Sequence, residues 1–120
     1  MAVRLVTSGE DLEALLQESH RRPVVLLKHS TACGVSARAH AEFASLAARW
    51  AGREGAPLFA LVRVIEERPL SQLVARRLGV MHESPQVILI RDGRAVWHDS
   101  HYGVTAAAIE AAFLPGGGGA

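Results

Sequence analysis

The residue best suited to chemistry in this chain is its single cysteine, Cys33. It follows a short apolar run from Pro23 to Leu27 and a polar turn, and a long helical pattern comes after it. An apolar run this short, with two β-branched valines, favours a buried strand over a helix. Cys33 would then lie where a strand ends and a helix begins, and the unpaired N–H groups and positive dipole end of a helix stabilise a thiolate there. The pattern indicates a redox-active cysteine.

The neighbours of Cys33 are small and polar, which leaves the sulfur open to another sulfur atom. A structural cysteine is expected within a strand or on an apolar helix face instead. Ser36 stands where a two-cysteine oxidoreductase carries its resolving sulfur. A hydroxyl forms no disulfide, so the second thiol must come from a small molecule or another protein. The alternative is that Ser36 is an ordinary first-turn serine; in either case its hydroxyl or N–H could hydrogen-bond the thiolate of Cys33.

Length and composition predict one globular domain over residues 1–114, followed by a flexible glycine-rich tail over residues 115–120. The net charge of +1 gives no basic field for nucleic acid. No apolar run approaches the roughly 20 residues that span a bilayer, and no secretory signal pattern is present. One cysteine forms no internal disulfide. We therefore expect a cytoplasmic protein.

Elements on either side of Cys33 follow from hydrophobic spacing and capping residues. Val3–Val6 is a short first strand. Thr7 or Ser8 caps a helix that buries its leucines and closes with positive charge at His20, Arg21 and Arg22. The remaining predicted elements are a central strand Val24–Lys28, a helix from Cys33 or Gly34 to about Ala51, a strand Leu58–Ile65, a helix from Arg68 to Gly79, strands Val87–Ile90 and Ala95–His98, and a last helix Ala106–Phe113 capped by Thr105.

The element order is βαβαβα, then a ββ hairpin and a final helix. Asp92-Gly93 is a strong hairpin signal and joins the last two strands. The first part requires parallel strands with right-handed crossovers, and the hairpin adds an antiparallel edge. This order predicts a thioredoxin-like α/β fold, a three-layer sandwich whose central mixed sheet is flanked by helices.

Several motifs resemble the monothiol bacilliredoxins of the YtxJ type across nearly the whole chain. They are Lys28-His-Ser-Thr-x-Cys33-x-x-Ser36 before an Ala-x-x-x-Phe43 helix, Val64-Ile-Glu-x-Arg-x-Leu-Ser71, Gly79-Val-x-His-Glu-Ser-Pro-Gln86, and Gly93-x-x-Val-Trp-His-x-Ser-His101. The resemblance implies a monothiol thiol–disulfide oxidoreductase that removes bacillithiol from S-bacillithiolated cytosolic proteins. Bacillithiol would be the co-substrate, and a disulfide reductase would act downstream.

The resemblance also implies roles for particular residues. Cys33 matches the attacking cysteine, and Thr31, Gly34 and Ser36 match the substrate-binding positions around it. Ser84-Pro85 matches the cis-proline loop that faces the cysteine in thioredoxin-like proteins, where the backbone of Ser84 would pair with a bound disulfide chain.

Gly34-Val35 departs from the Pro-Ile that members tend to have and gives Cys-Gly-x-Ser, closer to monothiol glutaredoxins of the CGFS type. The first alternative is therefore a module in which Cys33 of two chains and two external thiols hold a [2Fe–2S] cluster. The second is a non-catalytic thioredoxin-like scaffold in which Cys33 is buried.

Other polar residues support weaker hypotheses. His82, His98 and His101 lack a compact ligand spacing, so we expect no mononuclear metal site. His29 and His82 could face the thiolate, or be polar loop residues. Lys28 and Arg38 flank the Cys33 junction and could receive the carboxylates of a malate-bearing thiol such as bacillithiol, or be solvated charges.

Overall fold

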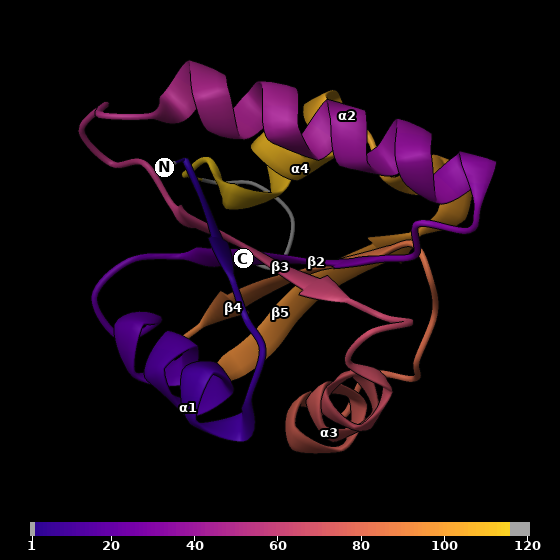
Figure 1. The fold of residues 1–120 in the computed structure, drawn as a ribbon. Helices are drawn as coiled ribbons and strands as arrows, with labels where there is room; N and C mark the ends of the chain where they lie inside the picture. The colour runs from indigo at the N-terminus through magenta and orange to yellow at the C-terminus, as the bar shows by residue number, and fades with distance from the viewer. Residues whose placement is uncertain (1, 116–120) are drawn as a thin grey trace.

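The computed structural model describes residues 2–115, so the predicted flexible tail lies outside the described residues except for Pro115. The chain forms a five-stranded sheet with helices on both sides (Figure 1). Across the sheet the strands lie in the order β1 (Val3–Leu5), β3 (Leu58–Arg63), β2 (Val24–His29), β4 (Gln86–Arg91) and β5 (Arg94–Ser100). Strand β2 is parallel to β3 and antiparallel to β4, which confirms the predicted mixed sheet.

Two helices cover each face of the sheet, as Figure 1 shows. On one face lie α2 (Gly34–Trp50) and α4 (Ala106–Phe113); on the other lie α1 (Gly9–Glu18) and α3 (Arg68–Leu78). A short 3₁₀ turn, η1 (His101–Gly103), joins β5 to α4. The result is the predicted three-layer α/β sandwich. In the described part of the chain, no helix is long and apolar enough to cross a membrane.

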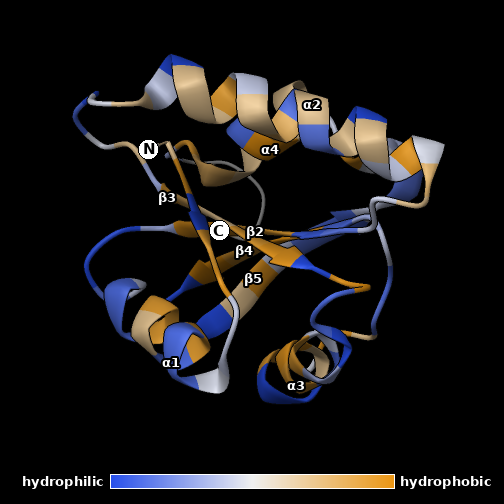
Figure 2. Ribbon diagram, in the orientation of Figure 1, coloured by the Kyte–Doolittle hydropathy of each residue, from blue (hydrophilic) through white to orange (hydrophobic). Residues whose placement is uncertain are grey.

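Each face of the sheet has its own apolar core because side chains alternate along a strand. In β2, Val24 and Leu26 pack toward α1 and α3, whereas Val25 and Leu27 pack toward α2 and α4. All four are buried. Figure 2 shows the matching hydrophobic colour on the strands and on the inner sides of the helices. The first four residues of β2 are therefore all apolar, and do not alternate with polar ones, because the strand is covered on both faces.

The first helix is shorter than predicted. Ser8 caps its start, and its hydroxyl accepts a hydrogen bond from the N–H of Asp11 at 3.1 Å. The helix ends at Glu18, so the prediction that His20 to Arg22 close it is wrong. Ser19 instead binds the β4–β5 turn: its carbonyl accepts from the N–H of Asp92 at 2.9 Å, and its hydroxyl accepts from the N–H of Gly93 at 2.8 Å. The local charge pattern of the sequence gave no indication of this tertiary contact.

The β4–β5 hairpin confirms the predicted Asp92-Gly93 turn. Both residues have positive φ, 52° and 75° respectively, as a two-residue hairpin turn requires. The hairpin strands are longer than expected, because pairing extends to Gln86 at one end and to Ser100 opposite it. The predicted strand Leu58–Ile65 is shorter and ends at Arg63.

Candidate functional site

Cys33 lies at the N-terminus of α2, as its sequence position predicts. It is the capping residue, with extended backbone angles of φ −122° and ψ 127°, and its carbonyl accepts the helical hydrogen bond from the N–H of Ala37 at 3.0 Å. Its side chain is partly exposed. The first turn of α2 contains no acidic residue. The thiol is thus placed at the positive end of a 17-residue helix without a nearby first-turn carboxylate.

The antiparallel pairing of β2 with β4 brings a second loop to this end of the sheet. Lys28 pairs with Gln86 at the end of the ladder, and Pro85 immediately precedes Gln86 in the chain. The connection from β2 into α2 and the connection from α3 into β4 accordingly lie side by side in Figure 1. The Ser84–Pro85 peptide bond is cis. Segments about fifty residues apart in the chain therefore meet at the end of β2.

The loop before β4 is held by hydrogen bonds at both of its sides. The side-chain amide of Gln86 donates to the carbonyl of Met81 at 3.0 Å, and the N–H of His101 donates to the carbonyl of Pro85 at 2.9 Å. Pro85 is buried, whereas Ser84 is partly exposed with a buried hydroxyl oxygen that has no hydrogen-bond partner. These hydrogen bonds fix the loop, which forms one side of the site.

Thr31 and Gly34 are exposed next to Cys33. A Cβ built on Gly34 would meet no atom within 4 Å, so open space lies over the first turn of α2. Together with Ser84 and Pro85, these residues lie at the same end of the sheet as the thiol. Thr31 and Gly34 are exposed to a ligand attached there, and Ser84 is partly exposed.

Ser36 is fully buried, and it does not serve the thiol in the way the sequence suggested. Its hydroxyl oxygen accepts a hydrogen bond from the N–H of Ser30 at 2.8 Å and lies 2.9 Å from Nδ1 of His29. The hypothesis that this hydroxyl bonds the thiolate of Cys33 is therefore wrong. Ser36 instead joins the β2–α2 connection to the helix that begins there.

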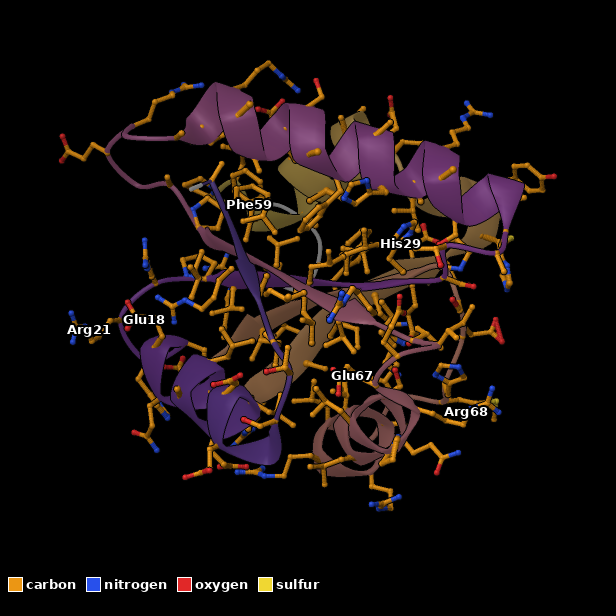
Figure 3. The ribbon with its side chains drawn as sticks, viewed as in Figure 1. Glu18, Arg21, His29, Phe59, Glu67 and Arg68 are labelled. Atoms are coloured by element: carbon orange, nitrogen blue, oxygen red, sulfur yellow. The ribbon has the colours of Figure 1, made fainter. Side chains whose placement is uncertain are left out.

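His29 is a core residue and not the predicted loop residue. It ends β2 on the face that packs against α2, as Figure 3 shows, and its ring stacks on that of His40 with centroids 4.7 Å apart. Burial and the charge of His40 lower the pKa of His29, while the bond to Ser36 and the charge of Glu66 oppose that shift. The imidazole is thus held in its neutral form near neutral pH.

Lys28 points to the opposite face and is fully buried. Its Nζ lies 3.2 Å from Nδ1 of His82, and burial lowers the pKa of Lys28 to about 8. The alternative that Lys28 is a solvated charge is wrong, because its side chain is fully buried; that it receives a carboxylate stays a prediction. Arg38, the other cation considered, is exposed on α2.

The histidines do not gather into a metal site in the described structure. Among residues 2–115, no group of three histidine, cysteine, aspartate or glutamate side chains could hold a metal ion. His101 pairs with Glu83, with Nε2 and Oε2 2.8 Å apart, and His98 is exposed on β5.

Sequence reasoning missed the contact between the buried side chain of Lys28 and His82, which is exposed on the loop before β4. The strand pattern contained a usable signal: Lys28 continues the series Val24, Leu26 along one face of β2, and both faces of a central strand are covered. The partner, 54 residues away in the chain, had no comparable signal.

Comparison with known proteins agrees with this geometry. A family model described as monothiol bacilliredoxin BrxC matches residues 4–109. The chain belongs to the monothiol bacilliredoxin family. The resemblance found in the sequence is thereby confirmed.

Solved structures confirm the fold of this bacilliredoxin-family chain. A protein described as having a thioredoxin fold is 28% identical, with a TM-score of 0.78 and 91% of each chain covered. Thioredoxin from Malassezia sympodialis is 18% identical, with a TM-score of 0.74, covering 98% of this chain and 91% of its own. Thioredoxin from Fasciola hepatica is 22% identical, with a TM-score of 0.68, covering 89% and 92%. Family and fold together indicate thiol redox chemistry.

Proposed function

We propose that this bacilliredoxin removes bacillithiol from S-bacillithiolated proteins through a mixed disulfide at Cys33. The observation that carries the proposal is the single, partly exposed thiol at the start of α2, with no second cysteine in the chain. The hydroxyl at the resolving position, Ser36, is buried and already bonded. An external thiol must therefore complete the cycle.

Two thiol–disulfide exchanges make up the cycle. The thiolate of Cys33 attacks the bacillithiol sulfur of the client's mixed disulfide; a Cys33–bacillithiol disulfide forms, and the client cysteine leaves as a thiolate. A second bacillithiol thiolate then attacks that adduct, which releases the Cys33 thiolate and bacillithiol disulfide. Over both exchanges, the client cysteine is reduced to the thiol, one free bacillithiol is oxidised, and it leaves joined to the bacillithiol taken from the client. A disulfide reductase would return the bacillithiol disulfide to the thiol.

The residues around Cys33 would bind the reacting chain. The exposed backbone of Thr31 and Gly34 adjoins the sulfur, and Ser84 precedes the cis proline on the facing loop. We propose that the backbone of Ser84 pairs with the chain that carries the disulfide and that Pro85 forms one side of the binding site. Ser36 acts as a positioning residue through Ser30 and His29. A cycle that consumes thiols belongs in a reducing compartment, and we place it in the cytoplasm.

Intact mass spectrometry tests the proposal. A bacillithiolated client incubated with the protein should lose its adduct, and the protein should gain one bacillithiol at Cys33. The matched control is Cys33→Ser, which should leave the client modified. A client that keeps its adduct equally well with either protein would reject the proposal.

The same preparation discriminates against the alternatives. Anaerobic purification should give a colourless protein with one reactive thiol. A brown protein with bound iron and visible absorption would favour the cluster-binding module instead. Very slow alkylation of the native protein at neutral pH would favour a scaffold, a role that the partial exposure of Cys33 argues against.

A further inference from the structure

A small cavity of about 220 Å³ opens beside the first turns of α3, on the side of the sheet opposite α2. We call it the α3 pocket, and its lining residues are Val64, Arg68, Ser71, Gln72 and His82. Four of these five residues, all but Gln72, lie in motifs already noted, yet the proposed exchange chemistry uses neither Arg68 nor Ser71. The pocket therefore calls for a separate explanation.

Several positive groups surround the pocket, and Glu67, the residue that caps α3, is paired with Arg63 at 3.9 Å between Oε2 and Nη2. Arg68 is the first residue of α3, an 11-residue helix whose first turn contains no acidic side chain. Figure 3 shows the side chain of Arg68 extending away from α3 on the side of the β3–α3 and α3–β4 connections. Behind His82 lies the buried ammonium of Lys28, and no carboxylate of residues 2–115 pairs with it. Helix dipole, guanidinium and buried ammonium all favour an anion.

His82 lines the pocket and has a second ring nitrogen that Lys28 does not use. An ammonium group has only donors, so the Nδ1 that faces Lys28 must accept, and the ring hydrogen lies on Nε2. Burial and the charges of Lys28 and Arg68 lower the pKa of His82, although Glu83 opposes them. Glu83 is itself paired with His101.

A buried polar atom also lacks a partner. Ser71 is 1% exposed, lines the pocket, and its hydroxyl has no hydrogen-bond partner. Unpaired buried polar groups cost about 1–3 kcal/mol, so they are rare unless a ligand or water satisfies them. A hydroxyl beside a guanidinium and an imidazole N–H matches the acceptor oxygens of a carboxylate.

The pocket lies at the same end of the sheet as the redox centre. Strands β2 and β3 are parallel; Cys33 follows the end of β2, and Arg68 follows the end of β3. His82 precedes Pro85 by three residues, a stretch of chain that spans at most about 11 Å. A small thiol joined to Cys33 would therefore approach α3 from the side of the proline loop.

We propose that the α3 pocket binds a carboxylate of the small thiol joined to Cys33, with Arg68 and Ser71 as its binding residues. This inference rests on the proposed function and names the part of the molecule that selects the thiol. Bacillithiol carries such carboxylates on its malyl group. Arg68 and Ser71 would then select the small thiol, and the exposed Arg38 on α2 would not.

Paired disulfide substrates test the proposal. The rate of adduct formation at Cys33 is measured with bacillithiol disulfide and with cystamine, a disulfide without carboxylates. We expect Arg68→Gln to slow the first reaction about tenfold and to leave the second unchanged, as for the loss of one charged hydrogen bond. Ser71→Ala should have a smaller effect of the same kind. The matched controls are the exposed arginines, Arg38→Gln and Arg76→Gln, which should change neither rate.

Equal slowing of both reactions by Arg68→Gln would overturn the proposal, as would a selective loss in Arg38→Gln. If the wild-type protein forms no adduct with either disulfide, the proposed function is rejected. A second measurement then tests carboxylate binding in the α3 pocket independently of adduct formation. In the Cys33→Ser protein, added malate should shift the amide NMR signals of Arg68, Ser71 and His82 in a saturable way. Shifts that do not saturate, or that persist in Arg68→Gln, would overturn the proposal that the α3 pocket binds a carboxylate of the small thiol. It would also be overturned if acidic client peptides gave the same shifts at lower concentration, because the pocket would then bind the client protein.

Discussion

The hydroxyl of Ser36 lies 2.9 Å from Nδ1 of His29, so the first turn of α2 is tied to the end of β2 by a buried hydrogen bond. The same oxygen accepts from the N–H of Ser30. Cys33 lies between these two anchored points, Ser30 and Ser36, and its position depends on them. Ser36, which stands at the position of a resolving cysteine, therefore has a structural role: it fixes the start of α2.

Replacing Ser36 by alanine should destabilise the protein by about 1–3 kcal/mol, because a buried N–H and a buried imidazole nitrogen both lose a partner. The measurement is urea unfolding followed by circular dichroism. Ser45→Ala, an exposed position on the same helix, is the control and should change the free energy of unfolding little. Equal effects of the two substitutions would contradict the role given to Ser36.

The stacked pair of His29 and His40 should make the protein sensitive to acid. The folded-state pKa of His29 is below its ordinary value of 6.5, so the unfolded state binds more protons as the pH falls through 6.5. Stability should therefore decrease from pH 7 down to the folded-state pKa. His29→Gln should flatten that slope, although His82, whose pKa is also lowered, will retain part of it. If the dependence of the melting temperature on pH is the same in His29→Gln as in the wild type, His29 does not contribute to the acid sensitivity.

Lys28 should make the protein more stable at alkaline pH. Its folded-state pKa is about 8 and its ordinary value is 10.5, so between these values the unfolded state holds the extra proton and stability rises with pH. Below pH 8 the burial of the charged ammonium lowers the free energy of unfolding by up to about 3 kcal/mol, since each unit of pKa difference corresponds to 1.36 kcal/mol. Lys28→Met should thus be the more stable protein at pH 7, with a difference that shrinks toward pH 10. Denaturant melts across this range, with Arg38→Met as control, check it; a pH-independent difference would count against it.

Gly34→Pro should stabilise the protein by about 0.4–1 kcal/mol. Gly34 is the first residue of α2, where proline is favoured, and the extended backbone of Cys33 before it suits a pre-proline residue. No atom lies within 4 Å of a Cβ at this position. Gly93→Pro is the contrasting control: φ at that residue is 75° and its N–H donates to Ser19, so it should destabilise strongly. A lower melting temperature for Gly34→Pro would show that the first turn of α2 needs the freedom of glycine.

The sequence was most informative where the signal is local. Asp92-Gly93, Pro69 and Gly79 gave the hairpin and both ends of α3, and the order of elements was enough for the sheet and its layers. The position of Cys33 at a helix start was likewise readable, because a strand pattern and a helix pattern meet there.

Long-range partners could not be read in this way. Ser19 ends α1 early because it bonds a turn more than seventy residues away, and Lys28 lies against His82 from a distant loop. Side-chain direction along β2 was available from alternation. The prediction ended the strand at Lys28 and allowed His29 to be a loop residue, so the interior direction of both side chains was not drawn from it. A covered strand continues to its last residue, His29, and both of its terminal polar side chains are therefore interior.

Strand β2 occupies the middle of the sheet, with β3 on one side and β4 on the other. Amide protons in such a strand are released to solvent last, in the slowest and most global openings of a fold. The connection that carries Cys33 leaves directly from it. Hydrogen–deuterium exchange should accordingly find the most protected amides of the protein a few residues from its reactive sulfur, so that the thiol can gain and lose an adduct while the platform beneath it stays closed.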